Sequence, residues 1–198
     1  MTLPTTTPGA AAPLEADPVT ALALRKIRAA FPDAVLAAEE GGRHPWIRVS
    51  PQRLKEVCLL LRDDPDTRLD CCHLVSGVDW PARKPGDVAE QEVVYHLVSY
   101  SKKSDPAYRK RAVKNDAFVA LKVRVPRDDP KVPSVLDVWT GADWHERETW
   151  DLVGIQFTGR HELTRILLPE DWPGHPLRKD WEYPTDYHGI PIIPPEGR

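Results

Sequence analysis

The chain has 198 residues and a formal net charge of −3, with 41% hydrophobic and 29% charged residues, which is the balance of one ordinary globular domain with tails. This charge gives no general attraction to nucleic acid or to an anionic membrane, and no apolar run approaches the roughly 20 residues that span a bilayer. The N-terminus lacks a basic start followed by an apolar block, so we expect no secretory signal and, by default, a cytoplasmic location.

The cysteines and the short motifs limit the redox chemistry. Cys58, Cys71 and Cys72 are the three cysteines, which is an odd number and too few for an all-cysteine iron–sulfur cluster. Neither the GxGxxG nor the GxxxxGK[ST] phosphate-binding pattern occurs. We therefore expect no cofactor in this chain, and any redox cofactors of its assembly would lie in other chains.

The N-terminal part predicts two helices and a hairpin. Residues 1–17 are rich in Pro, Ala and Thr, and we expect a disordered extension. Asp17 and Pro18 are typical of a helix start, and an amphipathic helix follows to Phe31. Residues 34–38 and 46–49 predict two strands joined through a glycine pair as a hairpin.

The middle of the chain completes an α+β pattern. A second helix is predicted after Ser50-Pro51, with apolar residues at helical spacing as far as Leu61. Strands follow near residues 69–78, 92–101 and 117–125, and the second is apolar on both faces, as in a central strand. The order αββαβββ predicts a two-layer domain with a mixed sheet. The intervening residues 102–114 are basic and predict an exposed hairpin tip.

Beyond Pro126 the pattern changes. A short helix is predicted over residues 133–139 and a better one over 143–153, whereas Pro and Gly recur every few residues from Pro169 on. We expect a core domain over residues 18–157 and an extended Pro-rich C-terminal arm over residues 158–198 that docks on a partner subunit.

The helix predicted at 143–153 carries recognisable end signals. Asp143 can cap it, and Glu146 can complete a capping box. Gly154 suits the left-handed position after the last turn. Arg147 and Asp151 have the spacing of an intrahelical ion pair. A solvated helix face and a binding surface both remain open for this pattern.

The arm combines charge with large aromatic rings. Trp172 and Trp181 belong to the five of the seven tryptophans that lie in the last third of the chain, and tryptophan is favoured at contact anchors. The guanidinium group of Arg178 can bind a carboxylate through two N–H donors. A disordered tail is the alternative, which the aromatic content disfavours.

Three other site hypotheses follow from single clusters. Cys71, Cys72 and His73 could suggest a metal site, but adjacent strand residues point to opposite faces, so buried free thiols fit better. Glu148 and the other carboxylates of the helix could act as general acids or bases, yet no nucleophile and base accompany them. His175 lies in a turn, where hydrogen bonding is the commoner role.

Four linked segments resemble one family. The segments are GVDW at 77–80, ERETWDLVGI at 146–155, RILLPEDW at 165–172 and GHPLRKDW at 174–181. In this order they resemble the 30 kDa subunit of respiratory complex I, the bacterial proton-pumping NADH:quinone oxidoreductase. One departure is Arg160, which stands where the family usually has histidine.

The resemblance implies a non-catalytic subunit of the peripheral arm, on the cytoplasmic side of the inner membrane. Family members carry no flavin, iron–sulfur cluster or nucleotide; FMN and the Fe–S clusters belong to partner subunits, and no metal site is expected in this chain.

Two partners are implied in the same way, and no nucleic acid. One is the forty-nine-kilodalton subunit, which helps form the quinone site and is called the quinone-site subunit below. The other is the twenty-kilodalton subunit, which bears the terminal iron–sulfur cluster and is called the terminal-cluster subunit below. The interface or signature residues that the resemblance implies are Glu146, Arg147, Glu148, Asp151, Gly154, Trp172, Gly174, His175, Pro176, Arg178, Lys179 and Asp180.

Two alternatives remain from the sequence. The chain could be the equivalent subunit of a related membrane-bound hydrogenase or of an oxidoreductase with another electron donor. It could also be a standalone hydrolase that uses the helical carboxylates.

Overall fold

A computed structural model describes residues 18–41, 44–101 and 118–192. The extension predicted at residues 1–17 and the basic hairpin tip predicted at 102–114 lie outside the described residues. Within the described ranges, no helix has both the length and the apolar character needed to cross a membrane.

The chain forms three α-helices and nine strands in the described residues. The helices are α1 (Pro18–Ala30), α2 (Leu54–Asp63, preceded by the 3-10 turn η1, Pro51–Arg53) and α5 (Ala142–Val153). The strands are β1 (Val35–Glu39), β2 (Trp46–Val49), β3 (Cys71–Trp80), β4 (Glu90–Val98), β5 (Phe118–Pro126), β6 (Lys131–Pro133), β7 (Gln156–Thr158), β8 (Asp186–Tyr187) and β9 (Ile190–Pro191).

The predicted αββαβββ order and mixed sheet are confirmed. The five-stranded sheet has the order β1-β2-β5-β4-β3. β2 and β5 pair in parallel, whereas the other neighbours are antiparallel. β4 lies between β5 and β3, which agrees with the interior position predicted from its two apolar faces. The predicted hairpin is also present as the β1–β2 pair.

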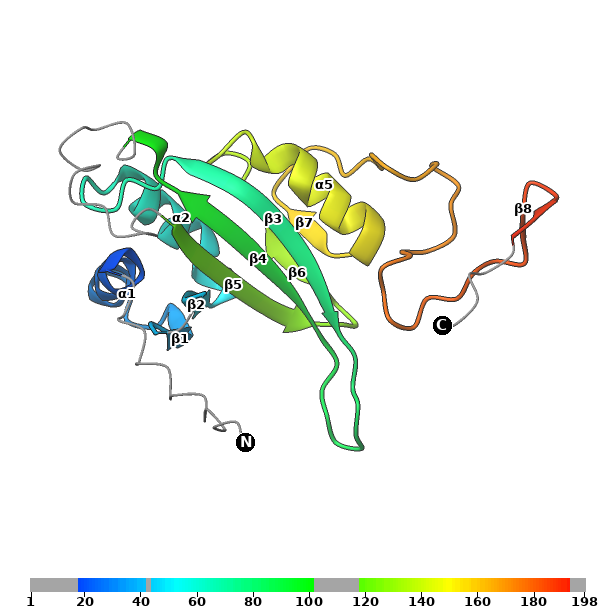
Figure 1. Cartoon of the computed structure of the whole chain (residues 1–198), viewed down its shortest axis with the longest axis horizontal. Helices are drawn as coiled ribbons and strands as arrows, with labels where there is room; N and C mark the ends of the chain where they lie inside the picture. The colour runs from blue at the N-terminus through cyan, green and yellow to red at the C-terminus, as the bar shows by residue number, and fades with distance from the viewer. Residues whose placement is uncertain (1–17, 42–43, 102–117, 193–198) are drawn as a thin grey trace, which may run out of the picture.

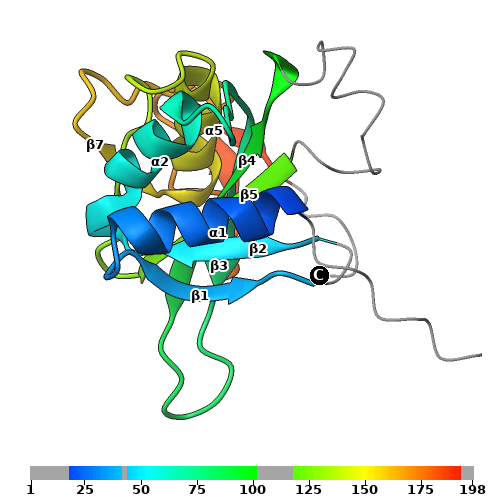
Figure 2. The same ribbon diagram turned by 90° about the vertical axis from the view of Figure 1, so that its left-hand side faces the viewer.

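The helices cover one face of this sheet, so the domain has two layers (Figures 1 and 2). On that face Val93, Tyr95 and Leu97 of β4 are buried. They belong to the same hydrophobic core as the apolar stripe of α2, where Val57 and Leu61 are fully buried. Periodic apolar residues on both partners explain why these segments form a helix and a strand and pack together.

Gly77 lets α5 approach β3 closely. A Cβ atom at this position would lie 2.7 Å from Cγ2 of Thr149 and 3.2 Å from Cγ2 of Val153. Any side chain would push the helix off the strand. The glycine of the GVDW segment thus fixes the height of α5 above the sheet.

The helix predicted over residues 133–139 is wrong. The segment begins as β6, which pairs in parallel with β7, and continues as a turn closed by the Val138 amide donating to the Val135 carbonyl. The amide of Val135 donates to the Glu146 carboxylate and that of Ser134 to the Thr158 carbonyl. These tertiary bonds hold the backbone in a non-helical path.

The arm has little regular structure, as predicted. Apart from the short β8–β9 hairpin, its described part after β7 contains no helix or strand. In Figure 1 the arm, coloured orange to red, follows β7, passes beside α5 and then extends away from the domain.

Candidate functional site

The start of α5 differs from the prediction. Asp143 lies inside the first turn, Gly141 is the cap residue, and no side chain caps the helix. Glu146 is fully buried, so it cannot reach back to form a capping box. Its carboxylate accepts hydrogen bonds from Ser134 Oγ at 2.7 Å, the Val135 amide at 2.8 Å and an Arg160 guanidinium nitrogen at 3.0 Å. A buried carboxylate needs such donors, which distant segments supply here.

Arg160 completes this buried cluster. Its side chain is only 5% exposed and also pairs with the Asp143 carboxylate. Burial raises the pKa of Glu146, and the bonds from Ser134 and Arg160 act in the opposite direction. The residue that departs from the family pattern is therefore built into the base of α5.

Asp151 fixes the next part of the chain. Its buried carboxylate accepts from Arg165 at 2.7 Å and from the amides of Ile166, Leu167 and Leu168 at 3.1, 2.9 and 3.0 Å. Burial alone would raise the pKa of Asp151, but these bonds outweigh it and hold the pKa below its usual value.

The predicted ion pair between Arg147 and Asp151 is therefore wrong. Asp151 points inward to the segment at 165–168. Arg147 instead donates to the carbonyls of Thr164 and Arg165 at 3.1 and 3.3 Å. Both side chains bind the first part of the arm rather than each other.

The end of α5 is held by the arm. Gly154 has φ 86°, which confirms the predicted left-handed turn. A Cβ atom at Gly154 would lie 2.6 Å from the ring of His175, so this glycine also makes room for the arm.

Three arm residues bind the carbonyls of the last turn of α5. His175 Nδ1 lies 2.9 Å from the Asp151 carbonyl; because a carbonyl only accepts, Nδ1 carries the proton. The Leu177 amide and Arg178 Nε donate to the next two carbonyls, each at 2.9 Å. Helix ends leave such carbonyls unpaired, and a cation there is favourable. Arg178 thus binds a helix end and not a carboxylate, contrary to expectation.

A second contact holds the arm to the sheet. Asp79, buried in β3, accepts from Arg127 at 2.7 and 2.8 Å and from the Lys179 amide at 2.8 Å. Arg127 also pairs with Asp180 at 2.6 Å. The Asp79 and Asp180 carboxylates raise the pKa of Arg127, which stays charged. Sequence reasoning did not select Asp79 or Arg127, although Asp79 lies in the GVDW segment.

We define residues 175–180 as the root of the arm. The residues on either side of the root carry an aromatic cluster: Trp172, Trp181, Tyr183 and Tyr187. The two tryptophan rings stack with centroids 6.4 Å apart, Tyr183 lies 4.7 Å from Trp181, and Tyr187 lies 5.1 Å from Trp172. Gly174, with φ 70°, makes room for Trp181. All four rings are only half-buried, and Nε1 of Trp172 is buried without a hydrogen-bond partner in the described structure.

The remaining predicted residues lie at the surface or in the turn. Glu148, Lys179 and Asp180 are exposed, and Pro176 is half-buried in the root. The structure thus brings Arg147, Asp151 and the root together, and leaves Glu148 apart from them.

The structure gives little support to a metal site at the cysteines or to acid–base catalysis by His175. Cys72 is buried, and burial raises the pKa of its thiol to about 12, which keeps it protonated. Among the described residues, no group of three or more His, Cys, Asp or Glu is placed to hold a metal ion. Burial also lowers the pKa of His175, whose Nδ1 is already used in the root.

Comparisons with known proteins agree on one family. A family model described as "Respiratory-chain NADH dehydrogenase, 30 Kd subunit" matches residues 47–187. The C subunit of the NADH-quinone oxidoreductase of Roseiflexus sp. (strain RS-1) is 44% identical over 160 residues, which are 81% of this chain and 82% of that protein. The protein of the same name from Acidothermus cellulolyticus is 40% identical over 172 residues, 85% of this chain and 81% of its own.

Two solved structures share the fold. A trypsin-resistant fragment of Nqo5 has a TM-score of 0.52 and 27% identity, and the match covers 73% of this chain and 99% of the fragment. A protein of the archaeal membrane-bound sulfane sulfur reductase has a TM-score of 0.57, covering 80% of this chain and 83% of its own. At 23% sequence identity, this similarity shows a shared fold and nothing more.

Proposed function

This chain belongs to the family of the 30 kDa subunit of respiratory-chain NADH dehydrogenase, and on that premise we propose that it is a non-catalytic scaffold whose arm binds neighbouring subunits. One observation carries this proposal: the arm is fixed at its root to α5 and β3, while its aromatic cluster remains half-exposed beyond them. Aromatic rings held in place outside a core are suited to anchor a partner, because little freedom is lost on binding.

The partners in this proposal are the quinone-site subunit and the terminal-cluster subunit. The chain would help hold them in place while electrons pass from NADH through FMN and Fe–S centres of other subunits to quinone, coupled to proton translocation. It would lie on the cytoplasmic side of the membrane and bind no cofactor itself. Of the carboxylates that could serve catalysis, Glu146 and Asp151 are buried and occupied by structural hydrogen bonds, which supports a scaffold role.

A related complex with another electron donor is the second candidate. The shared fold of the sulfane sulfur reductase protein favours it, whereas the relatives at 40% and 44% identity favour the NADH:quinone assembly. A standalone hydrolase is the weakest reading, because Glu148 is the one predicted acid–base residue of α5 that stays exposed, and it lies alone.

Affinity purification from host membranes tests the proposal. A tagged full-length chain should bring down the quinone-site and terminal-cluster subunits, identified by mass spectrometry. Deleting residues 181–198 removes Trp181, Tyr183 and Tyr187 but keeps the root, so it should abolish this capture and leave the thermal unfolding of the domain unchanged. Full capture of both subunits by the deleted chain would rule out the arm as the docking element.

A further inference from the structure

One long edge of the sheet has no strand partner. β3 has 10 residues and pairs with β4 on one side, while its other side meets no strand among the described residues. Such an edge presents unpaired backbone donors and acceptors, and proteins usually protect it with lysine, proline or short length. Cys71–Val78 contains neither lysine nor proline, and the register irregularity of β3 lies between Cys72 and Leu74, which leaves residues 74–78 as the regular part of the edge. This edge is therefore suited to accept another strand.

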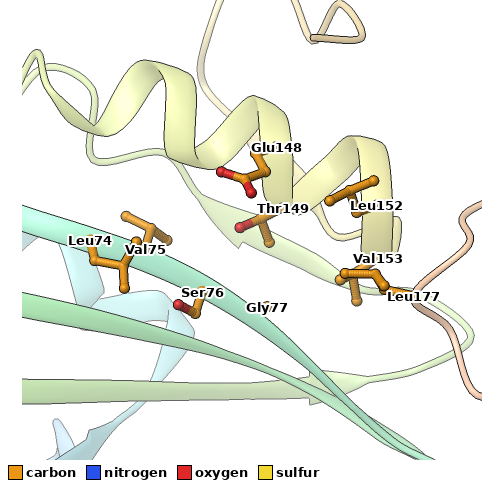
Figure 3. A pocket seen from close by; sticks show the side chains of 9 residues that line it. All are labelled: Leu74, Val75, Ser76, Gly77, Glu148, Thr149, Leu152, Val153 and Leu177. Atoms are coloured by element: carbon orange, nitrogen blue, oxygen red, sulfur yellow. The ribbon is translucent and has the colours of Figure 1, made fainter. Parts of the chain in front are cut away.

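A hollow of about 230 Å³ runs along the same edge (Figure 3). Four consecutive residues of β3, 74–77, form one wall, and Leu152 and Glu148 of α5 contribute to the other, with Leu177 of the arm at one end. Consecutive residues of a strand point to opposite faces of the sheet, and both faces can be reached only at the edge. A hollow that is lined by all four residues therefore runs along the edge of β3.

The hollow is apolar with a carboxylate at its rim. Leu74 is 38% exposed and Leu177 52% exposed, so both present apolar surface there. Glu148 is exposed and makes no hydrogen bond or ion pair within the part of the chain that the structure describes. It differs in this from Glu146 and Asp151 on the same helix, whose carboxylates are fully used.

We propose that this edge is a second docking surface, occupied by an extended segment of another subunit of the complex. The segment pairs through its backbone with β3, as in strand addition. It places one aliphatic side chain beside Leu152 and Leu177 on the helix-covered face, a second beside Leu74 on the other face of the sheet, and a lysine or arginine beside Glu148. The proposal depends on membership of a multisubunit complex. It uses Leu177 of the root, but it does not depend on the aromatic cluster of the arm.

Charge complementarity argues against two occupants from the chain itself, whereas the basic residues 102–114 match Glu148 in charge and are therefore one outcome of the test below. A second copy that paired β3 with β3 would bring Asp79 and no lysine or arginine to this edge. The N-terminal residues 1–17 contain Glu15 and Asp17 and likewise no basic side chain. Neither would neutralise Glu148.

Site-specific photocrosslinking in the assembled complex tests the contact. Benzoylphenylalanine at Leu74 should crosslink to another subunit, within a peptide that carries a lysine or arginine. Leu36, which is 60% exposed on the opposite edge strand β1, gives the matched control. A crosslink from position 74 to a second copy, to residues 1–17 or to residues 102–114, or no crosslink to any other subunit, would overturn the proposal.

Substitutions at this edge test how much the proposed contact contributes to assembly of the complex. Leu74→Glu and Glu148→Lys should each lower the amount of assembled complex on the order of tenfold, as at a contact anchor. Leu36→Glu and Glu40→Lys, the matched changes away from the hollow, should leave it within about twofold. Equal amounts of assembled complex in all four variants would contradict the proposal that the β3 edge is a docking surface.

A backbone readout separates strand addition from side-chain contact. Hydrogen exchange of the β3 amides should be slower in the complex than in the free full-length chain, and unchanged exchange would exclude pairing at this edge. Because the arm is intact in every variant, failure here leaves the arm proposal standing, and loss of capture on arm deletion does not test this edge.

Discussion

Replacing Asp151 by alanine should release the beginning of the arm from the domain. The carboxylate is fully buried and accepts four hydrogen bonds, one from Arg165 and three from the amides of Ile166, Leu167 and Leu168. After the substitution these donors lose their acceptor together. The contact between α5 and the arm then lacks its main polar link.

The size of the effect follows from burial. Removing one partner of a buried ion pair costs about 3–5 kcal/mol. Arg165 keeps bonds to the carbonyls of Trp172 and Gly174, and Leu167 is exposed enough for water to reach its amide. We therefore expect the free energy of unfolding to fall by about 3 kcal/mol, at the low end of that range.

Urea unfolding of the purified full-length chain measures this change, and Asp151→Asn adds a test of charge. Because the pKa of Asp151 is lower in the folded chain, its stabilising contribution is complete above the usual pKa near ~4 and is lost as pH falls through the folded value. The difference in unfolding free energy between wild type and Asp151→Asn should therefore shrink as the pH drops below about 4.

Glu148→Ala is the matched control, since it removes an exposed carboxylate from the same helix and should change stability by less than about 0.5 kcal/mol. If Asp151→Ala and Glu148→Ala were equally stable, the assignment of Asp151 as the anchor of the arm would be refuted.

Three further predictions follow from single contacts. Tyr95→Phe should be neutral or stabilising by up to about 1 kcal/mol, because the buried hydroxyl has no hydrogen-bond partner in the described structure; a clear loss in thermal unfolding would contradict this. Gly77→Ala should destabilise by about 1–3 kcal/mol through its clash with Thr149, and Thr149→Ser should recover part of the loss in a double-mutant cycle; additive effects would exclude the clash. Arg127→Ala should expose the chain near Asp180 to limited proteolysis, and an unchanged cleavage pattern would exclude this contact.

The fold was predictable because local patterns determine it. Apolar residues recur at helical spacing along α2, and Val57 and Leu61 are buried as that spacing requires. Gly154 was predictable for the same reason, since the turn after a helix has a local sequence signature. Such features need no knowledge of distant residues.

The polar contacts of α5 were not predictable because their partners are distant in sequence. Asp143 and Glu146 have the spacing of a capping box, but Ser134 and Arg160 offer Glu146 buried donors, and the tertiary contacts prevail. The bond from the Lys179 amide to Asp79 joins residues 100 positions apart. No local pattern signals a pair at that separation.

Native gels of host membranes show how much complex assembles when the aromatic cluster is removed. Trp172→Ala combined with Trp181→Ala changes rings outside the domain core, whereas Leu36→Ala changes an exposed residue on β1. We predict that the tryptophan variant loses the assembled complex and its NADH:quinone activity together, with the Leu36 variant unaffected. Normal assembly and activity in the tryptophan variant would contradict the account.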